Sequence, residues 1–108
     1  MPYDEGLAQL LRDDLADQET VEKKMFGGLA FMHRGHMLCG IHKGGGMFRV
    51  GKPNEAAALK VPGARPMTFT GRPMPGMIET GPEVFADDAR RRALLDLALA
   101  FNRSQPAK

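Results

Sequence analysis

Three histidines and the single cysteine are the residues whose types and spacing could hold a metal ion. They stand three positions apart, at His33, His36, Cys39 and His42. Strands are expected here, and along a strand Cys39 points away from His36 and His42. Those two histidines are then ~20 Å apart, too far to share one zinc ion with ligands at about 2 Å. His33 and His36 could share an ion only with outside ligands, so we interpret them as solvent-facing histidines at a hairpin end and expect no metal site.

Two further motifs indicate other chemistry, a nucleophile at Cys39 and a phosphate loop at Gly44–Gly46. A nucleophilic thiol needs a base or a helix N-terminus to lower its pKa, whereas Cys39 is expected on an apolar face, where a thiol reacts slowly. The glycine run lacks the G-x-x-x-x-G-K-[ST] spacing and precedes a strand, which predicts a flexible hairpin loop. Since no acid–base pair or catalytic triad remains, the sequence predicts neither an enzyme nor a bound cofactor.

Basic side chains could bind the phosphates of a nucleic acid. The run Arg90–Arg92 is flanked by Asp87 and Asp88, and no aromatic residue is interleaved with it. The net charge of +2 is small for an autonomous nucleic-acid binder. A solvated helix face is the simpler interpretation, and nucleic-acid binding is the alternative. The residues that would serve it are Lys23, Lys24, Arg34, Lys43, Arg49, Arg90, Arg91 and Arg92.

Antiparallel strands must position these residues between Val21 and Val50. The apolar runs there are short and separated by glycine-containing turns, which is typical of a meander. The expected strands are Val21–Phe26, Leu29–His33, His36–His42 and Met47–Val50. A two-residue turn at Arg34–Gly35 would pair His33 with His36, Met32 with Met37, Phe31 with Leu38, Ala30 with Cys39, and Leu29 with Gly40. A loop over Lys43–Gly46 would pair Ile41 with Phe48 and Cys39 with Val50.

This pairing divides the sheet into two faces. The first face is wholly apolar and is expected under the helices: Ala30, Met32, Met37, Cys39, Ile41, Phe48 and Val50. The second face has Leu29, Phe31 and Leu38 at its centre, with His33, His36, His42 and Arg49 around them. A half-apolar face of an antiparallel sheet is expected to be covered, by the later proline-rich segment, a second copy of the chain or another protein. Its expected contact residues are Leu29, Phe31, Leu38 and Arg49.

Helices are expected at both ends of the chain. Asp4 is the expected N-cap of an amphipathic helix to Ala16. A final helix from Asp87 or Asp88 to about Asn102 has an apolar stripe wide enough for two packing partners. Between them, Asn54 is expected to cap a short helix over Glu55–Lys60, and two short strands are expected at Met67–Thr70 and Met77–Glu79. The pattern predicts an α+β fold, an antiparallel sheet of five to six strands made of a meander plus a short hairpin, packed by N- and C-terminal helices.

Length and composition indicate one globular domain over residues 1–108. One cysteine cannot form an internal disulfide, and the acidic start Met1–Gly6 lacks the pattern of a signal peptide. No run approaches the roughly 20 apolar residues that cross a bilayer. We therefore expect a cytoplasmic protein that does not bind membranes.

The chain begins with a helix and a strand, followed by Met25-Phe26-Gly27-Gly28, and continues with a meander, a proline- and glycine-containing hairpin and a final helix. This order resembles the TfoX N-terminal domain family. The resemblance covers roughly residues 4 to 102. Its most specific part is Lys24–Gly28, supported by the turn at Gly35, by Met47–Val50 and by Gly71–Met74. It implies an α+β fold with helices packed on an antiparallel sheet. Met77 and Ile78 depart from the aromatic residues common at this place in relatives.

The best-known members are related to the Sxy competence regulator and carry a second, helical domain. They act with a cyclic-AMP receptor protein to switch on DNA-uptake genes. The resemblance thus implies a stand-alone regulatory module whose partner is a protein, such as transcription machinery or a cyclic-AMP receptor protein, and it supplies no catalytic residue. Our leading hypothesis is a non-enzymatic protein-interaction module that can self-associate as a homodimer. A weak nucleic-acid-binding regulator is the alternative, and an enzyme is the third hypothesis.

Overall fold

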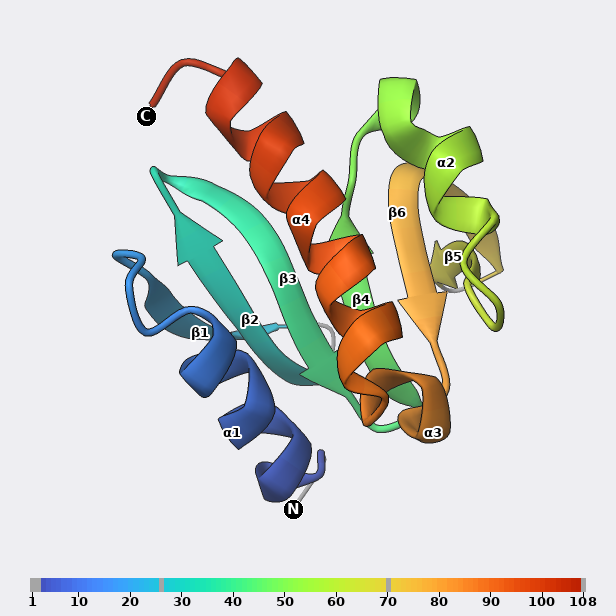
Figure 1. The fold of residues 1–108 in the computed structure, drawn as a ribbon, viewed down its shortest axis with the longest axis horizontal. Coiled ribbons are helices and arrows are strands. Elements are labelled where there is room, and N and C mark those ends of the chain that lie inside the picture. The colour runs from blue at the N-terminus through green and yellow to red at the C-terminus, as the bar shows by residue number, and fades with distance from the viewer. Residues whose placement is uncertain (1–2, 26, 70, 108) are drawn as a thin grey trace.

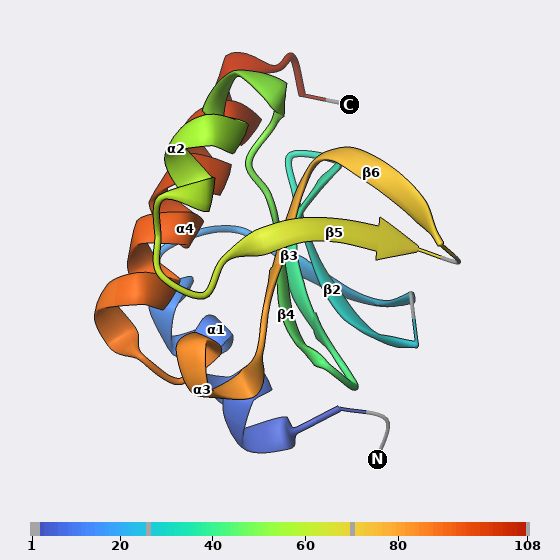
Figure 2. The ribbon, with the colours of Figure 1, turned by 90° about the vertical axis from the view of Figure 1, so that its right-hand side faces the viewer.

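One sheet of six antiparallel strands organises the molecule. The computed structural model describes residues 3–25, 27–69 and 71–107. The strand order across the sheet is β1-β2-β3-β4-β6-β5. The helices lie on one side of this sheet, and the strands at its two edges extend away from them on the other side (Figure 1 and Figure 2). The predicted α+β class and antiparallel sheet are therefore confirmed.

The first half of the chain follows the predicted order. Helix α1 spans Glu5–Asp14, and the carboxylate of Asp4 caps it by accepting from the amides of Gly6 and Leu7 at 2.8 and 3.2 Å. Four strands follow: β1 Val21–Met25, β2 Gly28–His33, β3 His36–His42 and β4 Gly45–Arg49. Phe26, which the predicted first strand includes, lies outside the described residues.

The second half departs from the expected bounds. Its elements are the 3-10 helix η1 Lys52–Asn54, α2 Glu55–Leu59, β5 Arg65–Phe69, β6 Arg72–Thr80, α3 Pro82–Phe85 and α4 Asp88–Ser104. Strand β6 continues through the predicted interruption at Met74–Gly76, because the carbonyl of Gly76 accepts from the amides of Val50 and Gly51, both at 3.0 Å. The proline in this stretch has no amide hydrogen to donate, but these two hydrogen bonds use only a carbonyl acceptor and are therefore still formed. Thr70 of the predicted strand lies outside the described residues.

Two caps were predicted in this half, and one is wrong. The carboxylate of Asp87 accepts from the amide of Arg90 at 3.0 Å and begins α4 as expected. The side chain of Asn54 does not cap α2. Its Nδ2 donates instead to the carbonyl of Val50 at 3.1 Å, so Asn54 ties the end of β4 to the turn that follows it.

A β-bulge in β3 corrects the predicted pairing. At the turn the prediction is confirmed, because His33 lies opposite His36 and Met32 opposite Met37. Beyond the turn Phe31 lies opposite Cys39, so Leu38 is the extra residue of the bulge. Because side chains alternate with a period of two, one extra residue exchanges the faces on one side of the bulge.

The face assignment was therefore wrong for β2 and the start of β3, whereas Cys39, Ile41, Phe48 and Val50 lie under the helices as predicted. Under the helices lie Leu29, Phe31, Leu38, Cys39, Ile41, Phe48 and Val50, all in the main core cluster with residues of α1, α3 and α4. Ala30, Met32 and Met37, which were expected with them, lie in a separate cluster on the other face. The β3–β4 connection also differs, since a two-residue turn at Lys43–Gly44 pairs His42 with Gly45 and Cys39 with Phe48. That shift is by two residues and leaves the faces unchanged.

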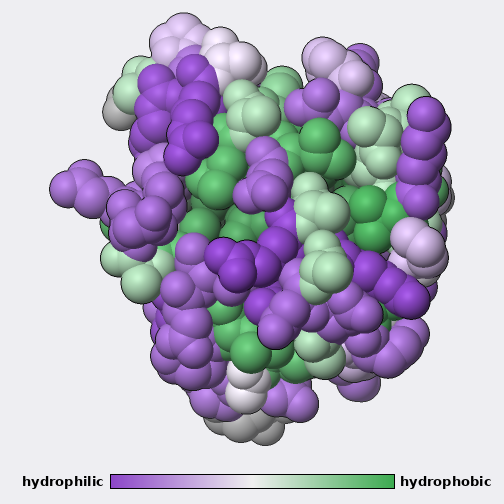
Figure 3. Space-filling model, in the orientation of Figure 1, coloured by the Kyte–Doolittle hydropathy of each residue, from purple (hydrophilic) through white to green (hydrophobic). Residues whose placement is uncertain are grey.

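The helices bury the larger of the two cores. Ala8, Leu11 and Leu15 of the α1 region and Leu94, Leu95 and Ala98 of α4 are buried against this face. Figure 3 shows this side of the molecule, where hydrophilic residues (purple) lie among hydrophobic ones (green). Among the described residues, no helix is long and apolar enough to cross a membrane.

Candidate functional site

Seven of the eight methionines gather on the sheet face that the helices leave open. Met47, Met67 and Met77 are buried there around Ala30. The partly buried members are Met25, Met32, Met37 and Met74. The strands that carry them, from β1 to β5, span the whole width of the sheet. We call this surface the methionine face.

A groove of about 620 Å³ crosses the methionine face. Its apolar lining comes from both ends of the sheet, with Met25, Met32 and Met37 on one side and Met74 and Met77 on the other. Gly40 leaves room for the side chain of Met47 at the floor of the groove, because a Cβ atom at Gly40 would lie 2.6 Å from the Cε of Met47. Its lining residues lie on β1, β2 and β3 at one side and on β6 at the other, with Arg49 of β4 between them.

Positive charge borders the groove. Arg49 and His36 are part of its lining. Lys23 is exposed and lies opposite Ala30, which places it on the methionine face, whereas its neighbour Glu22 reaches the helix side and accepts from Arg12 at 2.8 Å. The groove's described lining residues include no carboxylate. Glu79 shares the face but is engaged by Arg65, with Nε and Oε1 3.2 Å apart.

Three of the four predicted contact residues are not on this surface. Leu29, Phe31 and Leu38 are at most 5% exposed and pack under the helices, because the bulge turns them inward. Their prediction as partner contacts is wrong. Arg49 is different: its guanidinium lies 5.4 Å from the centre of the Phe101 ring and its Nη1 is 3.5 Å from Oε1 of Gln105. It is held at the end of the groove, and its contact role stays a prediction.

The predicted pair of solvent-facing histidines is also corrected. His33 and His36 are each 9% exposed. Nδ1 of His33 lies 2.6 Å from the carbonyl oxygen of Glu19, and Nε2 of His36 lies 2.8 Å from that of Pro106. A carbonyl oxygen only accepts, so each of these nitrogens carries a proton and donates. The two side chains thus hold separate neighbouring segments against the hairpin end.

Cys39 and His42 sit in different environments. Cys39 is fully buried in the core, and burial raises the pKa of its thiol, which agrees with a packing role. His42 accepts from the amide of Gly44 at 2.9 Å through Nδ1, and burial lowers the pKa of its imidazole. Among the described residues, no three His, Cys, Asp or Glu side chains cluster as metal ligands would.

The predicted basic residues do not share one surface. Arg91 is 2% exposed and pairs with Asp14 and Asp88, so its prediction as a phosphate contact is wrong. Arg34 donates to the carbonyl of Asn102 at 2.7 Å. Lys24 and Lys43 are exposed on the β1 edge and the β3–β4 turn, while Arg92 is exposed on α4. These three positions belong to three separate elements of the fold.

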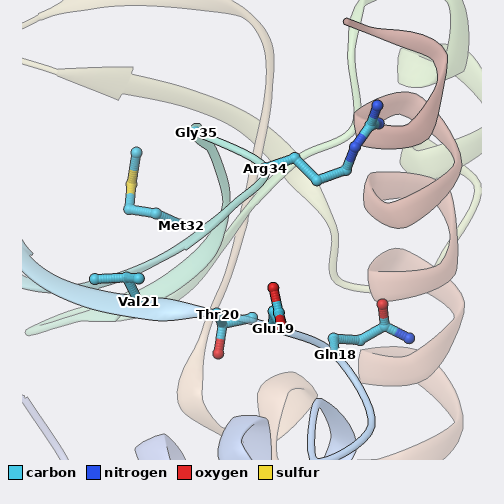
Figure 4. A pocket seen from close by; sticks show the side chains of 7 residues that line it. All are labelled: Gln18, Glu19, Thr20, Val21, Met32, Arg34 and Gly35. Atoms are coloured by element: carbon cyan, nitrogen blue, oxygen red, sulfur yellow. The ribbon is translucent and has the colours of Figure 1, made fainter. Parts of the chain in front are cut away.

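A second hollow, of about 550 Å³, lies between the α1–β1 connection and the β2–β3 turn. Figure 4 shows Val21 and Met32 side by side at its apolar end and Arg34 pointing away from it, toward α4. Glu19 contributes its backbone carbonyl to His33. The polar side chains of this hollow do not converge on one point, unlike those of a typical small-molecule site.

The comparisons with known proteins assign the family. The model of the TfoX N-terminal domain matches residues 13–102. The chain belongs to the TfoX N-terminal domain family. Comparison with curated proteins and with solved structures found no match. The family assignment confirms the resemblance that the sequence indicated.

The segment Lys24–Gly28, on which the resemblance mainly rested, links β1 to β2. Gly27 has a φ of +71°, which favours glycine, and a Cβ atom at Gly28 would overlap the carbonyl of Ile41 on β3. The two glycines thus allow the sheet edge to bend and β2 to lie close against β3. Phe26, the motif's central residue, lies outside the described residues.

Sequence reasoning missed the methionine face, although a signal for it was present. Met25, Met32, Met37 and Met47 all fall on predicted strands, and the excess of methionine over tyrosine and tryptophan was evident from composition. Only the bulge at Leu38 determines which strand face the methionines share, and Leu38 itself is an apolar residue like its neighbours.

Proposed function

We propose that this TfoX N-terminal domain is a non-enzymatic regulatory module that binds a partner protein through the methionine face. The observation that carries the proposal is the groove itself, an apolar hollow on the sheet face opposite the helices. Met32, Met37 and Met74 are only half-buried in it. Flexible thioether side chains suit a surface that adapts to a protein partner.

Two arrangements support a binding rather than a catalytic role. The thiol of Cys39 is enclosed in the core, and the ring nitrogens of His33 and His36 are engaged by backbone carbonyls. The groove itself is lined mainly by methionine and proline, with Arg49 and His36 as its titratable groups. A binding surface needs complementary shape and charge, which such a lining supplies without an acid–base pair.

The expected partner class comes from the family resemblance. A regulatory module of this kind would act on transcription machinery, with a cyclic-AMP receptor protein as one candidate, and would work in the cytoplasm. Nucleic-acid binding remains an alternative proposal, for which the scattered positions of Lys24, Lys43 and Arg92 give little support.

Affinity capture from the native host tests the proposal. The bait is the whole chain, compared with a variant that carries Met32→Glu and Met37→Glu in the groove. The control variant, with Ala56→Glu and Ala57→Glu, adds the same two charges at exposed positions on α2, on the helix side. We expect the wild type and the control to retain the same protein and the groove variant to lose it. Capture that the groove substitutions leave unchanged would contradict the proposal.

A further inference from the structure

We infer that the occupant of the methionine groove is an acidic segment of a partner protein that inserts aliphatic or aromatic side chains between the methionines. The inference rests on the proposed function and deepens it by naming the chemistry of the partner. Three features carry it: an apolar floor, a partly exposed thioether lining and a positively charged border.

The floor and lining define the apolar half of the partner. Met47 and Met77 close the bottom of the methionine face and are at most 5% exposed. Met32, Met37 and Met74 above them keep part of their surface in contact with solvent. Covering these side chains with an apolar partner surface removes that area from water, which stabilises a complex by about 25 cal/mol per Å² before the cost of association.

The border defines the sign of the partner's charge. Arg49 lines one end of the groove, and Lys23 is exposed on the same face at β1. Arg72 is exposed next to Pro73, which belongs to the lining. Glu79 on this face is already paired with Arg65. Carboxylates of a partner would therefore meet cations around the groove, and steering by these cations would accelerate the encounter.

The same charges disfavour a second copy of the chain as the occupant. In a two-fold symmetric dimer, each methionine face meets the same face of its partner. Lys23, Arg49 and Arg72 would then lie against an equally positive border, and like charges placed together oppose association. An acidic segment from another protein avoids this repulsion.

The lining also disfavours a nucleic acid. Proteins that bind single strands stack bases on aromatic side chains along a basic groove. The described lining residues are methionine, proline, glycine, histidine and arginine. One ring nitrogen of His36 is already hydrogen-bonded to the carbonyl of Pro106. The face offers thioether surface where a base would need an aromatic plane.

An unbiased peptide selection tests the charge and the apolar character together. The probe is a random linear peptide library displayed on phage, selected on the whole chain and counter-selected on the Met32→Glu and Met37→Glu variant. We expect the retained peptides to be enriched in Asp and Glu and in Leu, Ile or Phe. Enrichment of basic peptides, or of none that depend on the groove, would overturn the inference.

Methionine methyl NMR then locates the bound peptide. With ¹³C-methyl methionine, the selected peptide should shift the signals of Met32, Met37 and Met74, and the same peptide with Lys in place of Asp and Glu should not. Met37→Glu should weaken binding by about tenfold or more, and the size-matched Met37→Lys by less than about threefold, because only the first adds repulsion to the loss of apolar contact. Equal weakening by both variants would overturn the charge argument.

Two further outcomes separate this inference from the proposed function. A natural partner that is captured through the groove but docks a basic segment would leave the proposed function standing and overturn the inference. Methyl signals that shift with protein concentration alone would show a second copy as the occupant, and those that shift only with single-stranded DNA would show a nucleic acid. Either result would overturn the inference.

Discussion

Arg91 of α4 forms a two-pronged ion pair with Asp14 of α1, with Nε 2.7 Å from Oδ2 and Nη2 3.3 Å from Oδ1. Its Nη1 also donates to the carbonyl of Phe85 in α3 at 3.1 Å, and its Nη2 to Asp88 at 2.8 Å. The side chain is 3% exposed. One guanidinium therefore joins three helices above the main core.

Removing this guanidinium should cost more stability than an ordinary surface change. We expect Arg91→Leu to lower the free energy of unfolding by about 3 kcal/mol, because it leaves the carboxylate of Asp14, whose side chain is 10% exposed, without its partner. Arg92→Leu, at the exposed neighbouring position, should change it by less than about 0.5 kcal/mol. Urea denaturation of the two variants measures the difference.

A double-mutant cycle tests the physical reason for that loss. Arg91→Leu leaves the charge of Asp14 without a partner, and Asp14→Asn removes that charge. The double variant should therefore be more stable than the sum of the two single losses predicts. Additive losses would show that Arg91 acts by packing alone.

The run Arg90–Arg92 shows which features of α4 the sequence could predict and which it could not. Sequence reasoning predicted helix α4 and its cap correctly, because these depend on local spacing. It could not tell that Arg91 would be buried, since its partner Asp14 stands 77 residues away in the sequence. Long-range pairs of this kind leave no trace in a single sequence.

The two faces of the sheet show the same limit of prediction from the sequence. The strands and the turn at Arg34–Gly35 were predicted from alternation and glycine, and they are confirmed. The residues of β2 and the start of β3 were assigned to the wrong faces because the extra residue, Leu38, is as apolar as its neighbours, so that the pattern fits either register. The methionine groove, as a product of that register, could not be located from the sequence.

Close packing at Gly46 gives a second prediction. A Cβ atom at this position of β4 would overlap the ring of Phe85, which itself packs on Phe48 with ring centres 5.7 Å apart. We expect Gly46→Ala to lower the free energy of unfolding by about 2 kcal/mol or more, because the ring must leave its place in the core.

Gly44 provides the matched control in the same hairpin. A Cβ atom there would meet only the end of the His42 ring, at 3.2 Å, and that side chain can move. Gly44→Ala should therefore cost less than about 1 kcal/mol. Thermal or urea unfolding of both variants compares them, and equal losses would contradict the role given to Phe85.

Burial of Cys39 predicts slow thiol chemistry. The side chain is fully enclosed, and burial raises the pKa of its thiol, so little reactive thiolate forms at neutral pH. We expect a thiol-specific reagent to modify the folded chain far more slowly than the chain in denaturant. A rate under native conditions that matches the unfolded rate would place Cys39 outside the core.

His42 gives the chain a specific dependence on pH. Burial lowers the pKa of its imidazole below the ordinary 6.5; the carboxylate of Glu79, 3.6 Å from Nε2, acts in the opposite direction, and Arg65 adds to the lowering. Protonation would also end the acceptance of the Gly44 amide by Nδ1. Folding therefore favours the neutral ring.

The sign of the effect follows from this preference. Above pH 6.5 the ring is neutral in both states and contributes no pH dependence; as the pH falls below 6.5, the unfolded chain takes up the proton first and the folded state loses stability. We expect the free energy of unfolding to fall more steeply from pH 7 to 5 in the wild type than in His42→Gln. Urea denaturation across that range measures both. A smaller fall in the wild type would show that attraction to Glu79 outweighs burial.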